Sequence, residues 1–526
     1  MKTLFIYVIL HLNQPKHKKM FKKIIKTTFA SCLMLFSAEM MSQNLTYTVN
    51  LNDRSNDEFK VTLDLDKGLK SSAAIYQFAS TAPGTYQVMN IGRFVRSFKA
   101  FDAKGTEIST EKIGENQYKI SNPKETRKIQ YNIAEIWDTK VDKDKIYAMC
   151  GSSIEEDHAL INGQTVFGYP TGMQNAPLKI KIDFPKEWSF GTALSQDKNG
   201  FFEANNYDHI VDSPILMGRL TKATAKVAGA DIEVYTYSKT DKIKSDLLLN
   251  GMSDMLKAAG AFLKELPVKK YTFLFHFEDK GAGAWEHSYS SEYILKESEW
   301  SKEVAEGVVD IAAHEFFHVV TPLNIHSELI SNFNFVTPTA SEHLWLYEGT
   351  TEWASHKMQL NAGLKPLDEY FKELQLKIRI DENRFDRNYS LSKMSLTSFT
   401  AEGQKQYSNI YMRGALVAGL LDIRLLELSG GKRGLREVVN EFAKIYGPNK
   451  SFPEKKWFKV FVKKTYPEIA DFFDKYVKNA NSLPIEDYFK KIGIKYTSID
   501  KEPKFEIAPD ATPAQIALRK QWMTNF

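Results

Sequence analysis

The sequence IAAHEFFHVV occupies residues 311–320 and places two histidines, His314 and His318, four positions apart. Residues 301–320 are predicted to form one helix, with Ser301 as its N-cap and Pro322 preventing its continuation. Four residues are slightly more than one helical turn, so both imidazoles project from one face and can bind the same ion. Glu315 then lies where it can take a proton from an attacking water. A helix with two purely structural histidines is the alternative interpretation.

A second stretch, LWLYEGTTEW at residues 344–353, is also predicted to be helical and offers the missing ligand. Catalytic zinc usually has three protein ligands and one open position, so Glu348 is the expected third ligand of a single zinc ion. Two imidazoles and a carboxylate suit zinc better than magnesium or calcium. Glu352 shares a helical face with Glu348, and it can either support the metal site from behind or face solvent. The pattern favours solvent for Glu352.

The chain changes its periodicity near residues 220–230. Before that point, short runs of alternating apolar and polar residues predict antiparallel β-structure, as at residues 60–65, 129–133 and 178–182. Beyond residues 231–235, helical patterns dominate up to about residue 492, including an amphipathic helix at residues 434–446. With 526 residues, the chain is expected to form two or three domains.

The N-terminus has the composition of a secretory signal. Lysines are concentrated before residue 27, and an apolar run at residues 29–38 follows them, too short to span a bilayer stably. Cleavage is expected between Ala38 and Ser42, and translation can begin at Met20 instead of the first residue. The sequence thus predicts a periplasmic or extracellular protein, and a lipid anchor at Cys32 is the less favoured possibility.

Charge and cysteine content exclude two classes of protein. The formal net charge is +5, but residues 1–42 hold seven lysines and one glutamate, so the mature chain is close to −1. No basic stripe with interleaved aromatic residues follows, which argues against a nucleic-acid partner. Cys32 and Cys150 are the two cysteines, and a disulfide framework is therefore excluded.

His-Glu-x-x-His followed by Trp-Leu-x-Glu-Gly resembles the pattern of the gluzincin metallopeptidases. The surrounding residues are most similar to the glycyl aminopeptidase family, with further marks at residues 82–86 (APGTY), 93–95 (RFV) and 471–477 (DFFDKYV). The resemblance covers roughly residues 44–495. It implies a zinc aminopeptidase that prefers small N-terminal residues such as Gly or Ala on peptides with a free N-terminus. It also implies an α+β multidomain fold.

Two more functional stretches come from the same resemblance. Residues 283–287, GAWEH, are similar to the Gly-x-Met-Glu-Asn loop of related aminopeptidases, which implies that Gly283 and Glu286 bind substrate and that Glu286 receives the α-amine. His287 stands where the loop usually has Asn. Residues 411–414, YMRG, resemble the Tyr-x-Lys-Gly element whose tyrosine stabilises the oxyanion. Tyr411 is the expected residue, and Tyr407, one turn earlier, is its competitor.

The full expectation divides the chain into a signal at residues 1–42 and three folded parts. An N-terminal β domain is expected at 43–225, a thermolysin-like α/β catalytic domain at 226–430, and a helical C-terminal part with a tail at 431–526. The PDZ domain that many family members carry is expected to be missing. Two rival functions remain, a zinc endopeptidase on the same fold and an inactive peptide-binding protein. The oligomeric state is left open.

Overall fold

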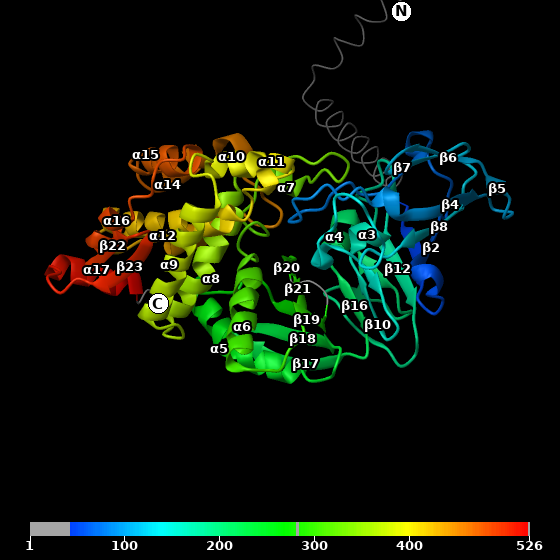
Figure 1. Cartoon of the computed structure of the whole chain (residues 1–526). Coiled ribbons are helices and arrows are strands. Elements are labelled where there is room, and N and C mark those ends of the chain that lie inside the picture. Colours follow the sequence, from blue (N-terminus) through cyan, green and yellow to red (C-terminus); the bar gives the residue numbers. More distant parts are fainter. Residues whose placement is uncertain (1–42, 280–282, 524–526) are drawn as a thin grey trace, which may run out of the picture.

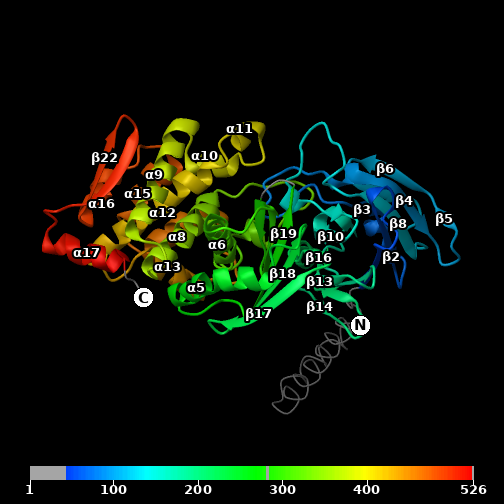
Figure 2. The ribbon, with the colours of Figure 1, turned by 60° about the horizontal axis from the view of Figure 1, so that its bottom comes forward.

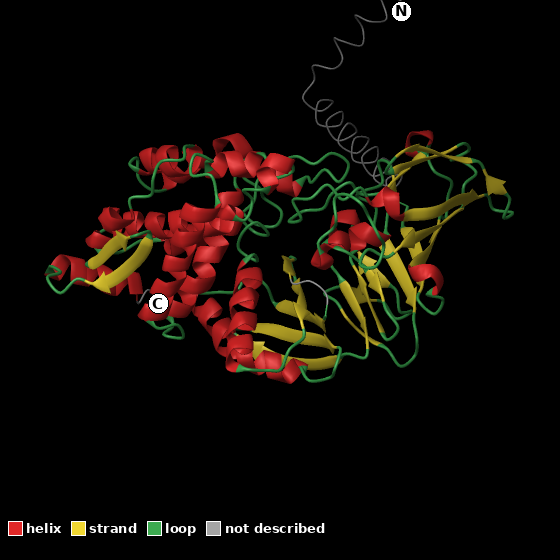
Figure 3. Ribbon diagram, viewed as in Figure 1, coloured by secondary structure: helices red, strands yellow, loops and turns green. Residues whose placement is uncertain are grey.

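The computed structural model describes residues 43–279 and 283–523, and the predicted signal at residues 1–42 lies outside them. Figure 1 shows an elongated molecule whose chain runs from β-sheets at one end to helices at the other. Figure 3 shows the same division by secondary structure. Within the described ranges, no helix combines the length and apolar character needed to cross a membrane.

The largest sheet of the β domain is a mixed eight-stranded sheet. In spatial order its strands are β14 (Ser195–Gln196), β15 (Phe202–Ala204), β12 (Leu178–Asp183), β1 (Leu45–Asn50), β2 (Glu58–Asp64), β8 (Lys128–Ala134), β4 (Val95–Phe101) and β5 (Glu107–Ile108). β1 runs parallel to β12, and the other neighbouring pairs are antiparallel. Alternate residues of β1, such as Tyr47 and Val49, are buried, as expected for a sheet with one core face.

Two antiparallel four-stranded sheets complete the β domain. One contains β13 (Ser189–Gly191), β16 (Ile215–Gly218), β10 (His158–Ile161) and β9 (Ser153–Ile154), and the other β11 (Tyr169–Pro170), β3 (Ile75–Gln77), β7 (Gln117–Ile120) and β6 (Thr110–Gly114). Short helical segments connect the strands: η1 (Ser55–Asp57), η2 (Ser71–Ala73), η3 (Ile91–Phe94), η4 (Ala148–Cys150), α3 (Gly163–Val166) and α4 (Tyr207–Val211).

A five-stranded sheet forms the centre of the molecule. Its order is β17 (Thr221–Val227), β18 (Ala230–Ser238), β19 (Lys270–Glu278), β21 (Ser290–Lys296) and β20 (Gly283–Glu286). β18, β19 and β21 are parallel, whereas β17 and β20 are antiparallel edge strands.

The two faces of the central sheet have different cover. Helices α5 (Ser245–Leu263) and α6 (Lys302–Phe317) pack on one face, where the ring of Phe316 lies 4.9 Å from that of Tyr271. On the other face, Leu160 of β10 and Leu216 of β16 join Leu274 of β19 in one buried apolar cluster. Figure 2 shows β10 and β16 beside β19. The β domain is therefore packed directly against the central sheet.

The remaining chain is mostly helical. Its elements are α7 (Glu328–Ser331), the π-helical turn η5 (Trp345–Gly349), α8 (Thr350–Asn361), α9 (Leu367–Arg384), α10 (Leu391–Leu396), α11 (Ala401–Gln404), α12 (Asn409–Leu428), α13 (Leu435–Ile445), η6 (Glu454–Lys456), α14 (Trp457–Lys464), α15 (Ile469–Phe473), η7 (Asp474–Lys478), α16 (Ile485–Lys491), β22 (Ile494–Ile499), β23 (Glu502–Ile507) and α17 (Pro513–Met523). The expected fold class is confirmed, while the domain boundaries stay predictions.

Several elements differ from the expectation. The helix predicted at 301–320 is α6, whose N-cap Ser301 accepts a hydrogen bond from the Val304 amide at 3.3 Å, but it ends at Phe317 because the chain turns before Pro322. Residues 283–286 form an edge strand, β20, instead of a loop. The expected C-terminal tail contains the hairpin of β22 and β23 followed by α17.

Candidate metal centre and active-site cleft

The last turn of α6 and the π-helical turn η5 bring three donor groups together. The Nε2 atoms of His314 and His318 are 3.2 Å apart, and Glu348 Oε2 lies 3.6 Å from the first and 3.4 Å from the second. All three residues are buried, and their donor atoms lie within 4.8 Å of one another. The expected ligand set is thus assembled in space, with the imidazoles facing the carboxylate.

The outward nitrogens of both imidazoles have acceptors of their own. His318 Nδ1 lies 3.0 Å from the carbonyl oxygen of Thr321, and His314 Nδ1 lies 2.8 Å from Glu352 Oε2. A proton on each Nδ1 can be donated to these oxygens, which leaves both Nε2 lone pairs directed at the common centre. Two neutral imidazoles and a carboxylate form a donor set that fits a divalent zinc ion.

The sequence suggested that Glu352 faces solvent, but the structure largely buries it beside the metal centre. Its side chain is 14% exposed and accepts hydrogen bonds from His314 and from the ammonium of Lys377, at 2.8 and 2.5 Å. Burial opposes ionisation, but these contacts and His356 hold the pKa of Glu352 well below its usual value. The sequence pattern missed this because Lys377 comes from α9, a different helix.

A close approach of two glycines positions Glu348. A Cβ added at Gly349 would lie 2.6 Å from the Cα of Gly414, so the backbones of η5 and α12 touch at this point. No other residue type leaves room for that contact. The start of α12, with Tyr411, is thereby brought next to Glu348. The sequence predicted a helix here, and the structure inserts one wide π turn, a distortion that is frequent at functional sites.

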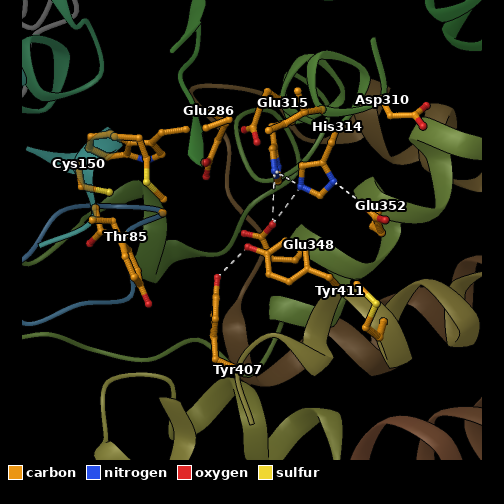
Figure 4. A pocket seen from close by; sticks show the side chains of 18 of the residues that line it. Thr85, Cys150, Glu286, Asp310, His314, Glu315, Glu348, Glu352, Tyr407 and Tyr411 are labelled. Carbon is orange, nitrogen blue, oxygen red and sulfur yellow. Dashed lines mark hydrogen bonds and ion pairs between the residues drawn. The ribbon is translucent and has the colours of Figure 1, made fainter. Parts of the chain in front are cut away.

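Two further carboxyl groups border the metal centre. Glu315, Glu286 and His318 also have donor atoms within 4.8 Å of one another, and Figure 4 shows Glu286 and Glu315 side by side. Burial raises the pKa of Glu315 to about 8; His314 opposes the rise, and Glu348 and Glu352 add to it. Burial likewise raises the pKa of Glu286 to about 8, with His318 opposing the rise and Glu348 adding to it. A divalent cation at the three ligands would lower both values.

Three tyrosines also lie next to the centre. The hydroxyl groups of Tyr407 and Tyr411 are 3.0 Å apart, and the Tyr411 ring lies 5.6 Å from that of His314. Tyr86 of the β domain donates a hydrogen bond to Glu348 Oε1 at 3.2 Å. Burial raises the pKa of each phenol well above its usual value, so all three remain hydrogen-bond donors.

The β domain supplies part of the cleft wall. The cleft has a volume of about 480 Å³, and its lining includes Thr85, Met149 and Cys150 from that domain. A Cβ added at Gly84 would lie 2.6 Å from Glu286 Oε1, and one at Gly283 would lie 2.5 Å from the sulfur of Met149. The motif at residues 82–86 carried the family resemblance, but its sequence gave no indication that Tyr86 reaches the metal centre.

Comparisons with known proteins agree with this geometry. The chain matches the Peptidase M61 N-terminal domain over residues 46–219 and the M61 glycyl aminopeptidase domain over residues 307–417, which together make up just over half of it. A crystal structure of an aminopeptidase N family protein from Idiomarina loihiensis shares the fold, with a TM-score of 0.75, 18% identity, and coverage of 86% of this chain and 79% of that chain.

Other comparisons are weaker. A mutant M1 zinc metallopeptidase from Deinococcus radiodurans, bound to a Tyr-Ser-Ala substrate, gives a TM-score of 0.49 at 12% identity, covering 84% of this chain and 96% of that chain. No curated protein matches the sequence. Because it matches both domains of this family, the chain belongs to the M61 glycyl aminopeptidase family and is a zinc-dependent metallopeptidase.

Proposed function

We propose that the protein is an exported aminopeptidase that removes single residues, preferentially small ones, from peptides with a free N-terminus. The observation that supports this most is the position of Glu286. Its carboxyl group belongs to neither the ligand triad nor the base, yet it lies within 4.8 Å of Glu315 and His318 donor atoms. An ammonium group held there would place the first peptide bond of a substrate at the metal centre.

Each residue then has one task. His314, His318 and Glu348 hold the zinc ion, which when bound acts as a Lewis acid on the substrate carbonyl and on water. Glu315 takes a proton from the attacking water and passes it to the leaving amine. Tyr411 donates a hydrogen bond to the carbonyl oxygen as negative charge develops on it, and Glu286 binds the α-ammonium.

Electrostatics support this division of roles. Contacts with the two imidazoles outweigh burial and hold the pKa of Glu348 at about 2, so this ligand is ionised at any physiological pH. Burial raises the pKa of the Glu315 carboxyl group, and a general base is most effective when its pKa lies near the working pH. The preference for small residues is supported by the family resemblance, and export by the lysine-rich and apolar stretches before residue 42.

The decisive experiment compares matched peptides with free and N-acetylated N-termini, each with Gly, Ala, Leu or Phe first. Wild-type enzyme restored with zinc after chelation is expected to cleave the free peptides, with Gly and Ala fastest. Glu315→Gln should abolish cleavage and keep the zinc. Cleavage of acetylated and free peptides at equal rates would establish the endopeptidase alternative instead.

Glu286→Gln is the matched variant for the amine site. Removing one partner of a buried charge pair typically costs about 2–5 kcal/mol, so kcat/KM for free peptides should fall at least about thirtyfold. Zinc content is expected to stay unchanged, because Glu286 is not a ligand. An unchanged kcat/KM would remove Glu286 from the amine site.

Export needs a separate test. After expression with the complete leader, the N-terminal sequence of the mature protein should begin between residues 39 and 43. An uncleaved protein retained in the cytoplasm would contradict the export part of the proposal.

A further inference from the structure

A second group of metal-ligating side chains lies where the β domain packs on the central sheet. His158 comes from β10, whereas His276 and Glu278 come from β19. Each offers one nitrogen or oxygen donor, and these donors lie within 4.8 Å of one another. The exposed fractions of the three residues are only 1%, 1% and 5%. The group is therefore enclosed by protein, like the ligands of the catalytic centre.

The two imidazoles face each other through their Nε2 atoms, which are 2.9 Å apart. His158 Nδ1 lies 2.8 Å from Asp157 Oδ1, and this carboxylate also accepts hydrogen bonds from Arg219 Nε and Tyr237 at 2.5 and 3.1 Å. An ionised Asp157 favours a proton on His158 Nδ1, which leaves the Nε2 lone pair directed toward His276. A carboxylate behind a ligating histidine is the usual arrangement around protein-bound zinc.

Neighbouring rings hold both imidazoles in position. Tyr237 stacks on His158 with ring centroids 3.7 Å apart, and Trp137 stacks on His276 at 4.9 Å. Both hydrogen bonds that Glu278 accepts within the described residues go to Oε2, from the Asp279 amide and from Lys239. No hydrogen bond from the described part of the chain reaches its Oε1, which can serve as a ligand atom. A preorganised donor set of this kind binds metal without a large loss of side-chain entropy.

We propose that His158, His276 and Glu278 form a second, structural site for a zinc-like divalent cation that joins the β domain to the central sheet. The donor types are the same as those of the metal ligands His314, His318 and Glu348. There the Nε2 atoms of the two histidines are 3.2 Å apart. Imidazole and carboxylate donors select such a cation over calcium or magnesium.

The site has a consequence for the cleft. Trp137, stacked on His276, donates a hydrogen bond from its indole nitrogen to the carbonyl oxygen of Ala148 at 2.9 Å. The next two residues, Met149 and Cys150, line the active-site cavity. An ion at this interface would therefore hold Trp137 in place and, through its hydrogen bond, the segment at Ala148 that leads into one wall of the cleft.

The test counts metal in a protein that lacks the catalytic site. After removal of all metal by a chelator, wild type reloaded with Zn²⁺ is expected to hold two ions per chain, and the His314→Ala/His318→Ala variant one. Adding Glu278→Gln to that variant should weaken Zn²⁺ binding at the remaining site. Because Glu278 is a ligand, the loss should exceed the about 10- to 100-fold that is typical when a residue hydrogen-bonded to a ligand is replaced. The control is Asp279→Asn. The Asp279 side chain is 67% exposed, so this substitution should leave metal binding unchanged.

A second readout does not depend on replacing a buried ligand. Co²⁺ added to the His314→Ala/His318→Ala variant should quench tryptophan fluorescence through Trp137, and Trp137→Phe should remove that component. If the catalytic-site variant binds no Zn²⁺, the proposal is wrong and the two imidazoles simply share a hydrogen bond. The proposal is also wrong if the variant retains an ion, but Glu278→Gln does not weaken its binding and Trp137→Phe does not reduce the quenching. Such an ion would lie elsewhere in the protein.

Discussion

Tyr407 and Tyr411 lie one helical turn apart with their hydroxyl groups 3.0 Å from each other. A hydroxyl that donates to a developing oxyanion contributes about 10²- to 10³-fold to kcat, so Tyr411→Phe is expected to lose that much and keep its zinc. Tyr407→Phe removes only a neighbour of Tyr411 and should lose less. Measurement of kcat, KM and zinc content for both variants checks the assignment, and a larger loss for Tyr407→Phe would reverse it.

Protons are expected to compete with zinc at His314. Burial disfavours its charged form, but the neighbouring carboxylates of Glu348 and Glu352 outweigh burial and raise the pKa of His314 well above its usual value. The metal-free imidazole therefore keeps its proton to a higher pH, and zinc must displace that proton to bind. The apparent Kd for zinc should rise as pH falls, by about tenfold per pH unit for each proton displaced.

A competition titration against a chelator at pH 6, 7 and 8 would measure this slope. Glu352→Gln is the informative variant, because it removes one of the two acceptors that raise the pKa of His314. Its slope should be shallower than that of wild type. A zinc affinity that does not change with pH would contradict the assignment of His314 as a protonated ligand in the metal-free protein.

Among the elements, the crossing of η5 and α12 depends on two glycines. A Cβ at Gly414 would lie 2.8 Å from the Cα of Gly349, and backbone atoms cannot move aside cheaply. Gly414→Ala is expected to destabilise the protein by about 1–3 kcal/mol and to lower activity, since it separates Tyr411 from Glu348.

Gly419 provides the matched control on the same helix. A Cβ there would meet Trp353 at an ordinary 3.5 Å, so Gly419→Ala should be neutral or stabilise α12 by up to about 1 kcal/mol. Denaturant unfolding and kcat/KM of both variants test the argument. Equal effects of the two substitutions would show that the glycine contact does not position the site.

Local sequence patterns predicted where helices and strands occur better than they predicted the ends and distortions of these elements. The spacing of His314 and His318 predicts both α6 and the shared face, because His314 lies in the last turn of α6 and His318 is its C-cap residue. The π turn of η5 depends on a contact with Gly414, which no pattern within residues 344–353 contains. The hairpin of β22 and β23 did have a local signal: residues alternate on both sides of Asp500 and Lys501, whose φ angles of 51° and 64° form the tight turn.

At the scale of the whole molecule, the β domain and the catalytic region share one site. Gly84 has a φ of 75°, and a Cβ there would press on Glu286 and Trp285 at 2.6 Å. Gly84→Ala is expected to lower kcat/KM for free peptides, mainly through KM, while zinc content stays constant.

Gly172, with a φ of 80° and no atom within 4 Å of an added Cβ, is the control. Both substitutions carry a similar backbone penalty of roughly 1–2 kcal/mol, but only Gly84→Ala reaches the site. Comparable stability losses with unequal kcat/KM values are the expected outcome. A loss of activity in Gly172→Ala as large as in Gly84→Ala would attribute the effect to folding instead.

Contacts between distant segments mark the limit of prediction from sequence. The role of Tyr86 depends on Glu348, 262 positions away, and the burial of Glu352 depends on Lys377, 25 positions away. The two residues of each pair are too far apart in the sequence for a helical or strand periodicity to relate them. The triad of His314, His318 and Glu348 could be predicted because two of its members lie four positions apart at the end of α6 and the third follows within a recognisable motif.

The hydrogen bond between Tyr86 and Glu348 also bears on when the enzyme becomes active during synthesis. A ribosome must release both segments, and the long loop between them must close, before the centre is complete. A nascent or partly unfolded chain is consequently expected to lack peptidase activity. Peptide cleavage should appear in a single late phase of refolding, after most secondary structure has formed, so that activity reports the assembly of the entire molecule.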